Sequence, residues 1–147
     1  FTVSPVRHWK DGAEQNQLSK STLLLAIHEL IDKFENIEYF PSYEIMMDDL
    51  RDYRFYTEDM LHPNKVAIDY IWDKFSDRYF DNTTLLLIKE ISKIVKAVNH
   101  RPYNEESDSH QKFIAKQLSE IDKLKLKNSF LDFTNELEYL GKKLIGK

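Results

Sequence analysis

The first six residues, FTVSPV (residues 1–6), decide the fold class that the sequence predicts. They are apolar and rich in residues that favour extended backbone, which predicts a short buried strand. Pro5 has no N–H group and limits ladder hydrogen bonding near the end of that strand. The polar stretch RHWKDGAEQNQ (residues 7–17) contains the turn signal Asp11–Gly12 and is predicted to be a loop.

Working outward, the segments after this strand alternate between helical and extended patterns. A helix is predicted from Ser19 or Ser21, since either serine can cap it. NIEYFPSYEI (residues 36–45) predicts a second short strand around Pro41, and MMDDLRDYRFYTEDML (residues 46–61) a structured loop. The predicted apolar stripe of the first helix consists of Leu23, Ile27, Leu30, Ile31 and Phe34.

A further helix is predicted to begin at Pro63, whose missing N–H costs nothing at the first helical position. Its predicted apolar face is formed by Val66, Tyr70, Ile71 and Phe75. The order strand, helix, strand, loop, helix over residues 1–82 is typical of an α/β sheet. Two short strands alone make a marginal sheet, so we expect residues 1–82 to be the second part of a larger α/β domain.

Beyond residue 82 only helical periodicity is evident. The expected helices cover residues 83–98, 107–128 and 129–144, with the connection NHRPYNEE at residues 99–106. We expect residues 83–147 to be a helical C-terminal extension that packs on the first domain. The exposed edges of the short strands would favour association between copies, which predicts a homo-oligomer.

Composition excludes several classes of function. The formal net charge is −4 with both signs interspersed, so nucleic acid is not the expected main partner. The chain has no cysteine, its five histidines lack metal-ligand spacing, and its three glycines do not cluster as a phosphate-binding loop requires. We therefore expect no metal and no other cofactor. No membrane span is expected either, because no apolar run is long enough to cross a bilayer. The compartment stays open, with the cytoplasm favoured, because any leader would precede residue 1.

The candidate catalytic residues are Asp59 and His62, in YTEDMLHPNKVAIDYIW (residues 56–72). A hydrolytic triad needs a nucleophile, an imidazole to take its proton and a carboxylate to orient that imidazole. Asp59 and His62, three residues apart ahead of a helix, can supply the last two groups. The simpler alternative is an aspartate favoured by the dipole of a helix start, beside a surface histidine.

A family resemblance favours the catalytic interpretation. DMLHPNKVAIDYIWDKF (residues 59–75) is similar to the last conserved block of the SGNH serine esterases and lipases, where an aspartate, two residues and a histidine close the active site. The chain more specifically resembles the GSCFA family, an SGNH-like group known chiefly from bacteria. The segments that carry this resemblance are SPVRH, NQLSKSTL, YFPSYEI and DDLRDYRFYTEDMLHP.

The resemblance implies the C-terminal part of an SGNH-like α/β three-layer sandwich, itself mostly helical with about two short strands. Asp59 would orient His62, and His62 would activate a serine that lies upstream together with the oxyanion hole. The fragment would then be inactive alone. The implied substrate of the full-length protein is a small-molecule or carbohydrate-linked carboxylic ester, and an acyltransferase would use the same residues.

Three further residues are candidates for binding the substrate: Arg7 and His8, at the carboxyl end of the first predicted strand, and Arg54 in the loop. Ligands of α/β sheets bind at that edge, and Arg7 can hold an anionic group through two hydrogen bonds. Each arginine could instead pair with one of the many carboxylates. The rival interpretation of the whole chain is a non-enzymatic helical interaction module.

Overall fold

The computed structural model describes residues 1–100 and 102–144. Arg101, in the predicted connection at residues 99–106, and residues 145–147, at the end of the predicted extension, lie outside the described residues. The chain divides into two compact units, Phe1–Phe80 and Asp81–Lys147. None of the described helices combines the length and apolar composition needed to cross a membrane.

The predicted α/β sandwich with two short strands is wrong for the described residues, which contain helices but no strand. Residues 1–5 and 37–40 are extended segments that pair only around Phe1, and the predicted second strand at residues 36–45 becomes helical from Ser42. Phe1 donates its N-terminal amine to the Glu38 carbonyl at 2.7 Å, and Phe40 donates its N–H to the Phe1 carbonyl at 2.8 Å. The next N–H, that of Ser42, instead donates to the Phe40 carbonyl at 2.9 Å where α2 begins, so the ladder ends before it becomes a sheet.

The first unit nevertheless follows the predicted chain path. The extended segment at residues 1–5 leads through the 3₁₀ turn η1 (Trp9–Asp11) into α1 (Gly12–Lys33). Helix α1 begins inside the predicted loop, where Gly12 has a φ of 84° that a side chain would strain. After the second extended segment come α2 (Ser42–Glu44), the π-helical turn η2 (Ile45–Asp49), the 3₁₀ turn η3 (Tyr53–Phe55) and α3 (Lys65–Tyr79).

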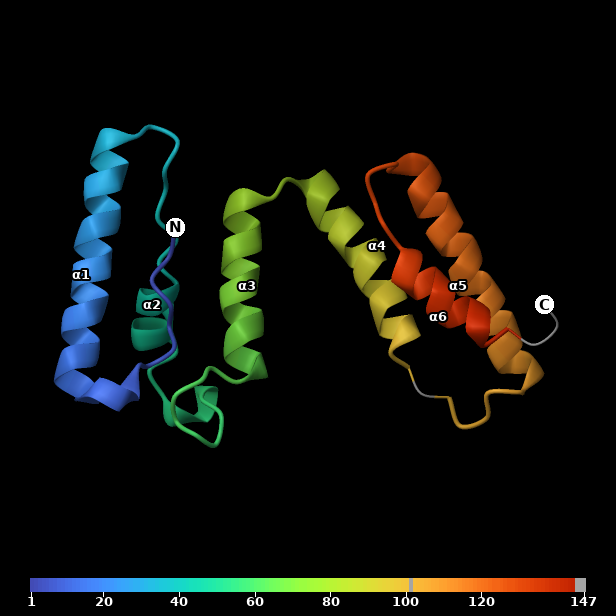
Figure 1. Cartoon of the computed structure of the whole chain (residues 1–147), viewed down its shortest axis with the longest axis horizontal. Coiled ribbons are helices and arrows are strands. Elements are labelled where there is room, and N and C mark those ends of the chain that lie inside the picture. Colours follow the sequence, from blue (N-terminus) through green and yellow to red (C-terminus); the bar gives the residue numbers. More distant parts are fainter. Residues whose placement is uncertain (101, 145–147) are drawn as a thin grey trace. The chain divides into compact units, whose positions relative to one another are not determined.

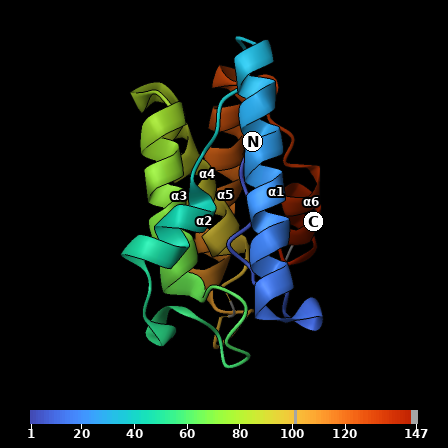
Figure 2. The ribbon, with the colours of Figure 1, turned by 90° about the vertical axis from the view of Figure 1, so that its left-hand side faces the viewer.

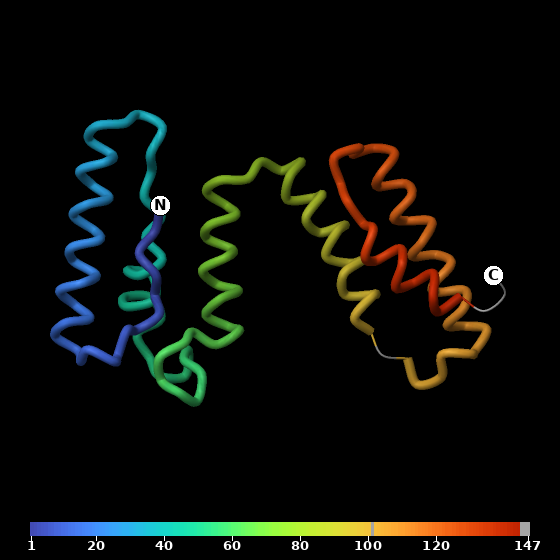
Figure 3. Tube along the Cα trace, viewed as in Figure 1, coloured from blue at the N-terminus to red at the C-terminus, as the bar shows by residue number. Residues whose placement is uncertain are grey.

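Both extended segments lie between α1 and α3, and these two helices run in the same direction (Figures 1 and 2). On the α1 side, Lys20 donates from Nζ to the Ser4 carbonyl at 2.6 Å. On the α3 side, the Phe40 ring meets the Phe75 ring edge-on at 5.1 Å between centroids. The chain therefore descends, returns through α1, descends again and returns through α3, as its trace shows (Figure 3).

The predicted apolar faces of α1 and α3 are only partly buried. Ile27 of α1 is buried, whereas Leu23 and Phe34 are about half exposed. In α3 the buried residues are Ala67 and Ser76, and the predicted Val66 is 63% exposed. A hydrophobic core of this unit lies around η2 and the start of α3. Its buried residues are Met46, Leu50, Tyr56 and Ala67.

The second unit contains the helices α4 (Asn82–Val98), α5 (Asp108–Lys127) and α6 (Thr134–Lys142). Helix α5 runs opposite to α4 and α6 (Figure 1). Asp81 and Ser107 cap α4 and α5 by accepting hydrogen bonds from backbone N–H groups in the first turn. The buried core of this unit is formed by Ile94, Ile114, Ile121, Leu124, Phe133 and Leu140.

Substitution of Ile121 by alanine should destabilise the second unit strongly. Ile121 is fully buried, so its truncation removes apolar contacts and leaves a cavity, with an expected loss of about 2–5 kcal/mol in unfolding free energy. Chemical denaturation followed by circular dichroism measures this loss. Leu126→Ala is the control on the same helix, because Leu126 is 87% exposed and its truncation should change stability by less than about 0.5 kcal/mol. Equal effects of the two substitutions would contradict the assigned core.

Candidate active site

A short loop between η3 and α3 carries both predicted catalytic residues. An isolated antiparallel bridge joins Tyr56 to Pro63 and closes this loop. Next to the bridge, the Thr57 N–H donates to the His62 carbonyl at 2.8 Å, and the Asn64 N–H donates to the Phe55 carbonyl at 2.9 Å. Residues 57–62 are thereby fixed as a closed turn.

Asp59 organises the inside of that turn. Its Oδ1 accepts hydrogen bonds from the Thr57 hydroxyl at 2.6 Å, the Leu61 N–H at 2.9 Å and the His62 N–H at 3.0 Å. Its Oδ2 lies 2.5 Å from Nδ1 of His62. Met60 has a φ of 60°, the left-handed conformation that few non-glycine residues adopt. This conformation turns the chain back, so that the next two amides reach the carboxylate.

The hydrogen bonds to Asp59 keep its carboxyl group ionised. The His62 N–H, the Thr57 hydroxyl, the Leu61 N–H and the His62 ring hold the pKa of the Asp59 carboxyl well below its usual range. Asp59 is therefore ionised at neutral pH and can only accept hydrogen bonds, so Nδ1 of His62 must carry the proton. In the neutral ring the lone pair is then on Nε2. No described residue forms a hydrogen bond with this nitrogen. A ring in this state can accept a proton at Nε2.

The start of α3 uses a different residue. Asn64 is the N-cap, and its Oδ1 accepts from the Ala67 N–H at 3.2 Å. The Asn64 amide group also donates to the Arg54 carbonyl at 2.6 Å, which ties the loop to the helix. Pro63 lies one position before the cap rather than at the first helical position. Asp59 is thus not the capping residue of α3, and the cap alone gives no reason for an imidazole at position 62.

Arg7 is the predicted binding residue that lies nearest to the pair. Its backbone N–H donates to the Leu61 carbonyl at 3.5 Å, and its guanidinium lies 4.5 Å from the centroid of the Tyr56 ring. A cavity of about 300 Å³ lies here. The residues that line it are Arg7, Trp9, Tyr53, Asp59, Met60 and Leu61.

His8 and Arg54 do not line this cavity. Nδ1 of His8 lies 3.0 Å from the Asp11 carboxylate, and the His8 side chain is 67% exposed. The Arg54 guanidinium lies over its neighbour's ring, Phe55, at 4.9 Å, with its Nε 3.9 Å from Asp52. Their roles in substrate binding stay predictions, as do the catalytic roles of Asp59 and His62.

Sequence reasoning missed several residues that shape this site. Thr57 and Asn64 hold the loop, and a signal existed for each: a short polar side chain two residues before an aspartate, and an asparagine just before a helix. Trp9 is 54% exposed and lines the cavity. Nothing in the sequence indicates that Trp9 approaches position 59.

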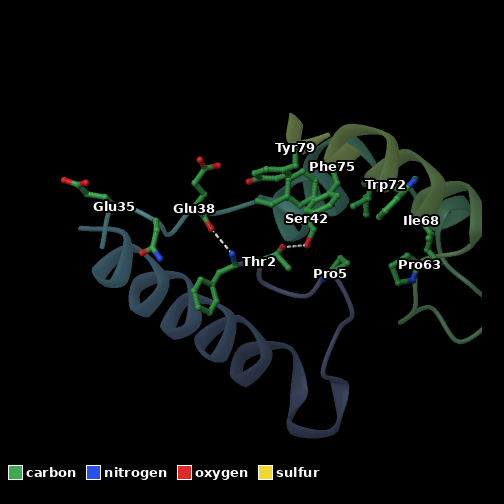
Figure 4. Close-up of a pocket in the computed structure, with 14 residues that line it drawn as sticks. Thr2, Pro5, Glu35, Glu38, Ser42, Pro63, Ile68, Trp72, Phe75 and Tyr79 are labelled. Carbon is green, nitrogen blue, oxygen red and sulfur yellow. Dashed lines mark hydrogen bonds between the residues drawn. The ribbon is translucent and has the colours of Figure 1, made fainter. Parts of the chain in front are cut away.

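A larger groove of about 860 Å³ lies on the other side of the loop, between the N-terminal segment and α3. Trp72, Phe75 and Tyr79 lie on one side of it, with Thr2 and Pro5 opposite (Figure 4). Within the described residues, no group of three or more histidine, cysteine or acidic side chains could hold a metal ion. The expected homo-oligomer stays a prediction, but the strand edges expected to form it are absent from the described residues.

The comparisons with known proteins agree with the predicted family. The model of the GSCFA family matches residues 1–75, and that of the GSCFA domain protein, C-terminal domain, matches residues 91–146. The chain belongs to the GSCFA family. The first match contains the whole Asp59–His62 loop of this GSCFA chain and Arg7 beside it. No curated protein and no solved structure was found to match it.

Replacing Thr57 by valine should raise the pKa of Asp59, because the hydroxyl donates one of the hydrogen bonds that stabilise the ionised carboxylate. Carbon-13 NMR titration of the Asp59 carboxyl measures this pKa. Thr22→Val is the control, since the Thr22 hydroxyl is bound to the Leu18 carbonyl on α1. The prediction fails if both variants titrate like the unsubstituted chain.

The lowered pKa of Asp59 also makes the stability of the fold depend on pH. A carboxyl whose folded pKa is lowered stabilises the fold above its unfolded pKa of about 3.9, and this contribution disappears as the pH falls through the folded value. We expect the protection of the Leu61 and His62 amides against hydrogen exchange, relative to the intrinsic exchange rate at each pH, to fall only on strong acidification. A loss of protection already near pH 5 would contradict the assigned hydrogen bonds.

Proposed function

We propose that Asp59 and His62 are the orienting carboxylate and general base of a serine esterase, in which the nucleophilic serine is supplied by a part of the protein outside these 147 residues. The observation that carries the proposal is the 2.5 Å contact between the Asp59 carboxylate and Nδ1 of His62. A carboxylate on Nδ1 fixes the tautomer whose Nε2 can deprotonate a hydroxyl group and later protonate the leaving group.

The exposure of the pair supports this proposal. The side chain of His62 is 59% exposed and that of Asp59 is 45% exposed, so the ring is not enclosed by this chain's own core. Its Nε2 is open to a hydroxyl group from elsewhere. Each role follows from one contact: Asp59 orients the ring, and the turn that Thr57 closes holds Asp59.

The rival interpretation as a helical interaction module loses its main support at the start of α3. That interpretation makes the Asp59–His62 segment a device for starting a helix, but Asn64 performs the capping. Transfer of the acyl group to an alcohol would use the same two residues. Product analysis in the presence of an added alcohol acceptor distinguishes transfer from hydrolysis.

The test uses a longer form of the protein that includes the region before residue 1, and a short-chain chromogenic ester as substrate. His62→Ala should lower kcat by roughly 10⁶-fold, because the serine loses its base. Asp59→Asn should lower kcat by roughly 10³- to 10⁴-fold, because an amide group no longer fixes the tautomer. Circular dichroism confirms that both variants fold.

His28→Ala is the matched control, since His28 is an exposed histidine on α1 whose ring contacts Tyr39. It should leave kcat unchanged. Esterase activity that survives His62→Ala at the level of the His28→Ala control would remove His62 from the mechanism and refute the proposal.

A further inference from the structure

Arg7 lies over two aromatic rings at the edge of the candidate active site. Its guanidinium stacks at 4.5 Å from the Tyr56 ring centroid and lies 5.7 Å from that of Tyr53. Tyr56 is itself only 6% exposed, so this face of the guanidinium rests on a fixed core residue. Aromatic stacking orients the guanidinium plane but does not occupy its N–H donors in that plane.

No acidic side chain among the described residues forms an ion pair with Arg7, although the chain has 25 aspartate and glutamate residues. The alternative of a loop arginine paired with a carboxylate is therefore not what the structure contains. Arg7 is also only partly exposed. A guanidinium that is partly withdrawn from water, oriented and without a carboxylate partner is suited to binding an oxyanion through two hydrogen bonds.

The cavity beside Arg7 has the composition of a binding site. It measures about 300 Å³, and Trp9 and Tyr53 contribute aromatic surface at its rim, where they are 54% and 63% exposed. Asp59 also lines this cavity and would repel an anion if its charge were free. Its two oxygens instead accept from the backbone, from Thr57 and from His62, which offsets that charge.

We propose that Arg7 and the cavity beside it form a binding site for an oxyanion, a carboxylate or a phosphate, carried by the ligand of this protein. Because Asp59 lines this cavity and its Oδ2 bonds to Nδ1 of His62, the anionic group would lie close to the imidazole. Resting on the proposed function, the inference then names the substrate class: esters that carry a negatively charged group next to the ester that is cleaved. Trp9 and Tyr53 would pack against the uncharged part of such a molecule.

The test measures binding directly and needs no ester. Acetate and inorganic phosphate are titrated into the chain at constant ionic strength, with the backbone amide shifts of Tyr53 and Leu61 followed by NMR. We expect saturable shifts with at least one of the two anions. Arg7→Gln should weaken this binding roughly tenfold or more, because the charged donor is lost. Arg78→Gln, which removes an exposed arginine of α3, should leave it unchanged.

The shifts of the Thr57 and His62 amides report whether the loop remains intact. If Arg7→Gln disturbs them, Arg7→Lys is used instead, and weaker binding is again expected because lysine lacks the planar fork. Linear, non-saturating shifts in the unsubstituted chain, or equal binding by the Arg7 variant, would overturn the inference. Oxyanion binding without esterase activity in the longer protein would refute only the proposed function, and the reverse result would refute only the oxyanion site.

Discussion

The carboxylate of Asp59 is the constraint on which the rest of the candidate site depends. One oxygen accepts from two successive backbone amides and from Thr57, and the other faces the ring of His62. The same group therefore shapes the loop and sets the tautomer of the imidazole. Because these hydrogen bonds need the ionised form, they lower the pKa of Asp59 and keep its carboxylate charged well below neutral pH.

The shape of the loop depends on local contacts, whereas its position depends on tertiary contacts. The turn at residues 57–62 is local, since every hydrogen bond to Asp59 comes from within three residues of it. Its position is tertiary, because Arg7 donates to the Leu61 carbonyl from the end of the N-terminal segment. An imidazole, a guanidinium and an aromatic-lined cavity thereby come together. Such a combination suits a ligand that has both a charged group and an ester.

The helices of the second unit were predictable because a helix satisfies its backbone hydrogen bonds within itself, so periodicity and capping residues suffice. The strands of the first unit were not. A strand exists only through pairing with a partner, and here the partners meet around Phe1 alone before α2 begins at Ser42. The predicted second strand at residues 36–45 becomes helical from Ser42, and the sheet that would make the fold α/β is not formed by the described residues.

The sequence by itself determined the family, the helical second unit and the pair of residues that meet, because a D-x-x-H spacing can close over one turn. Only the tertiary structure decided that Arg7 rather than His8 or Arg54 lies beside the pair. The physical reason is that this outcome depends on contacts between segments far apart in the chain. Arg7 and Leu61 are brought together by the packing of the N-terminal segment against the loop, which no local pattern records.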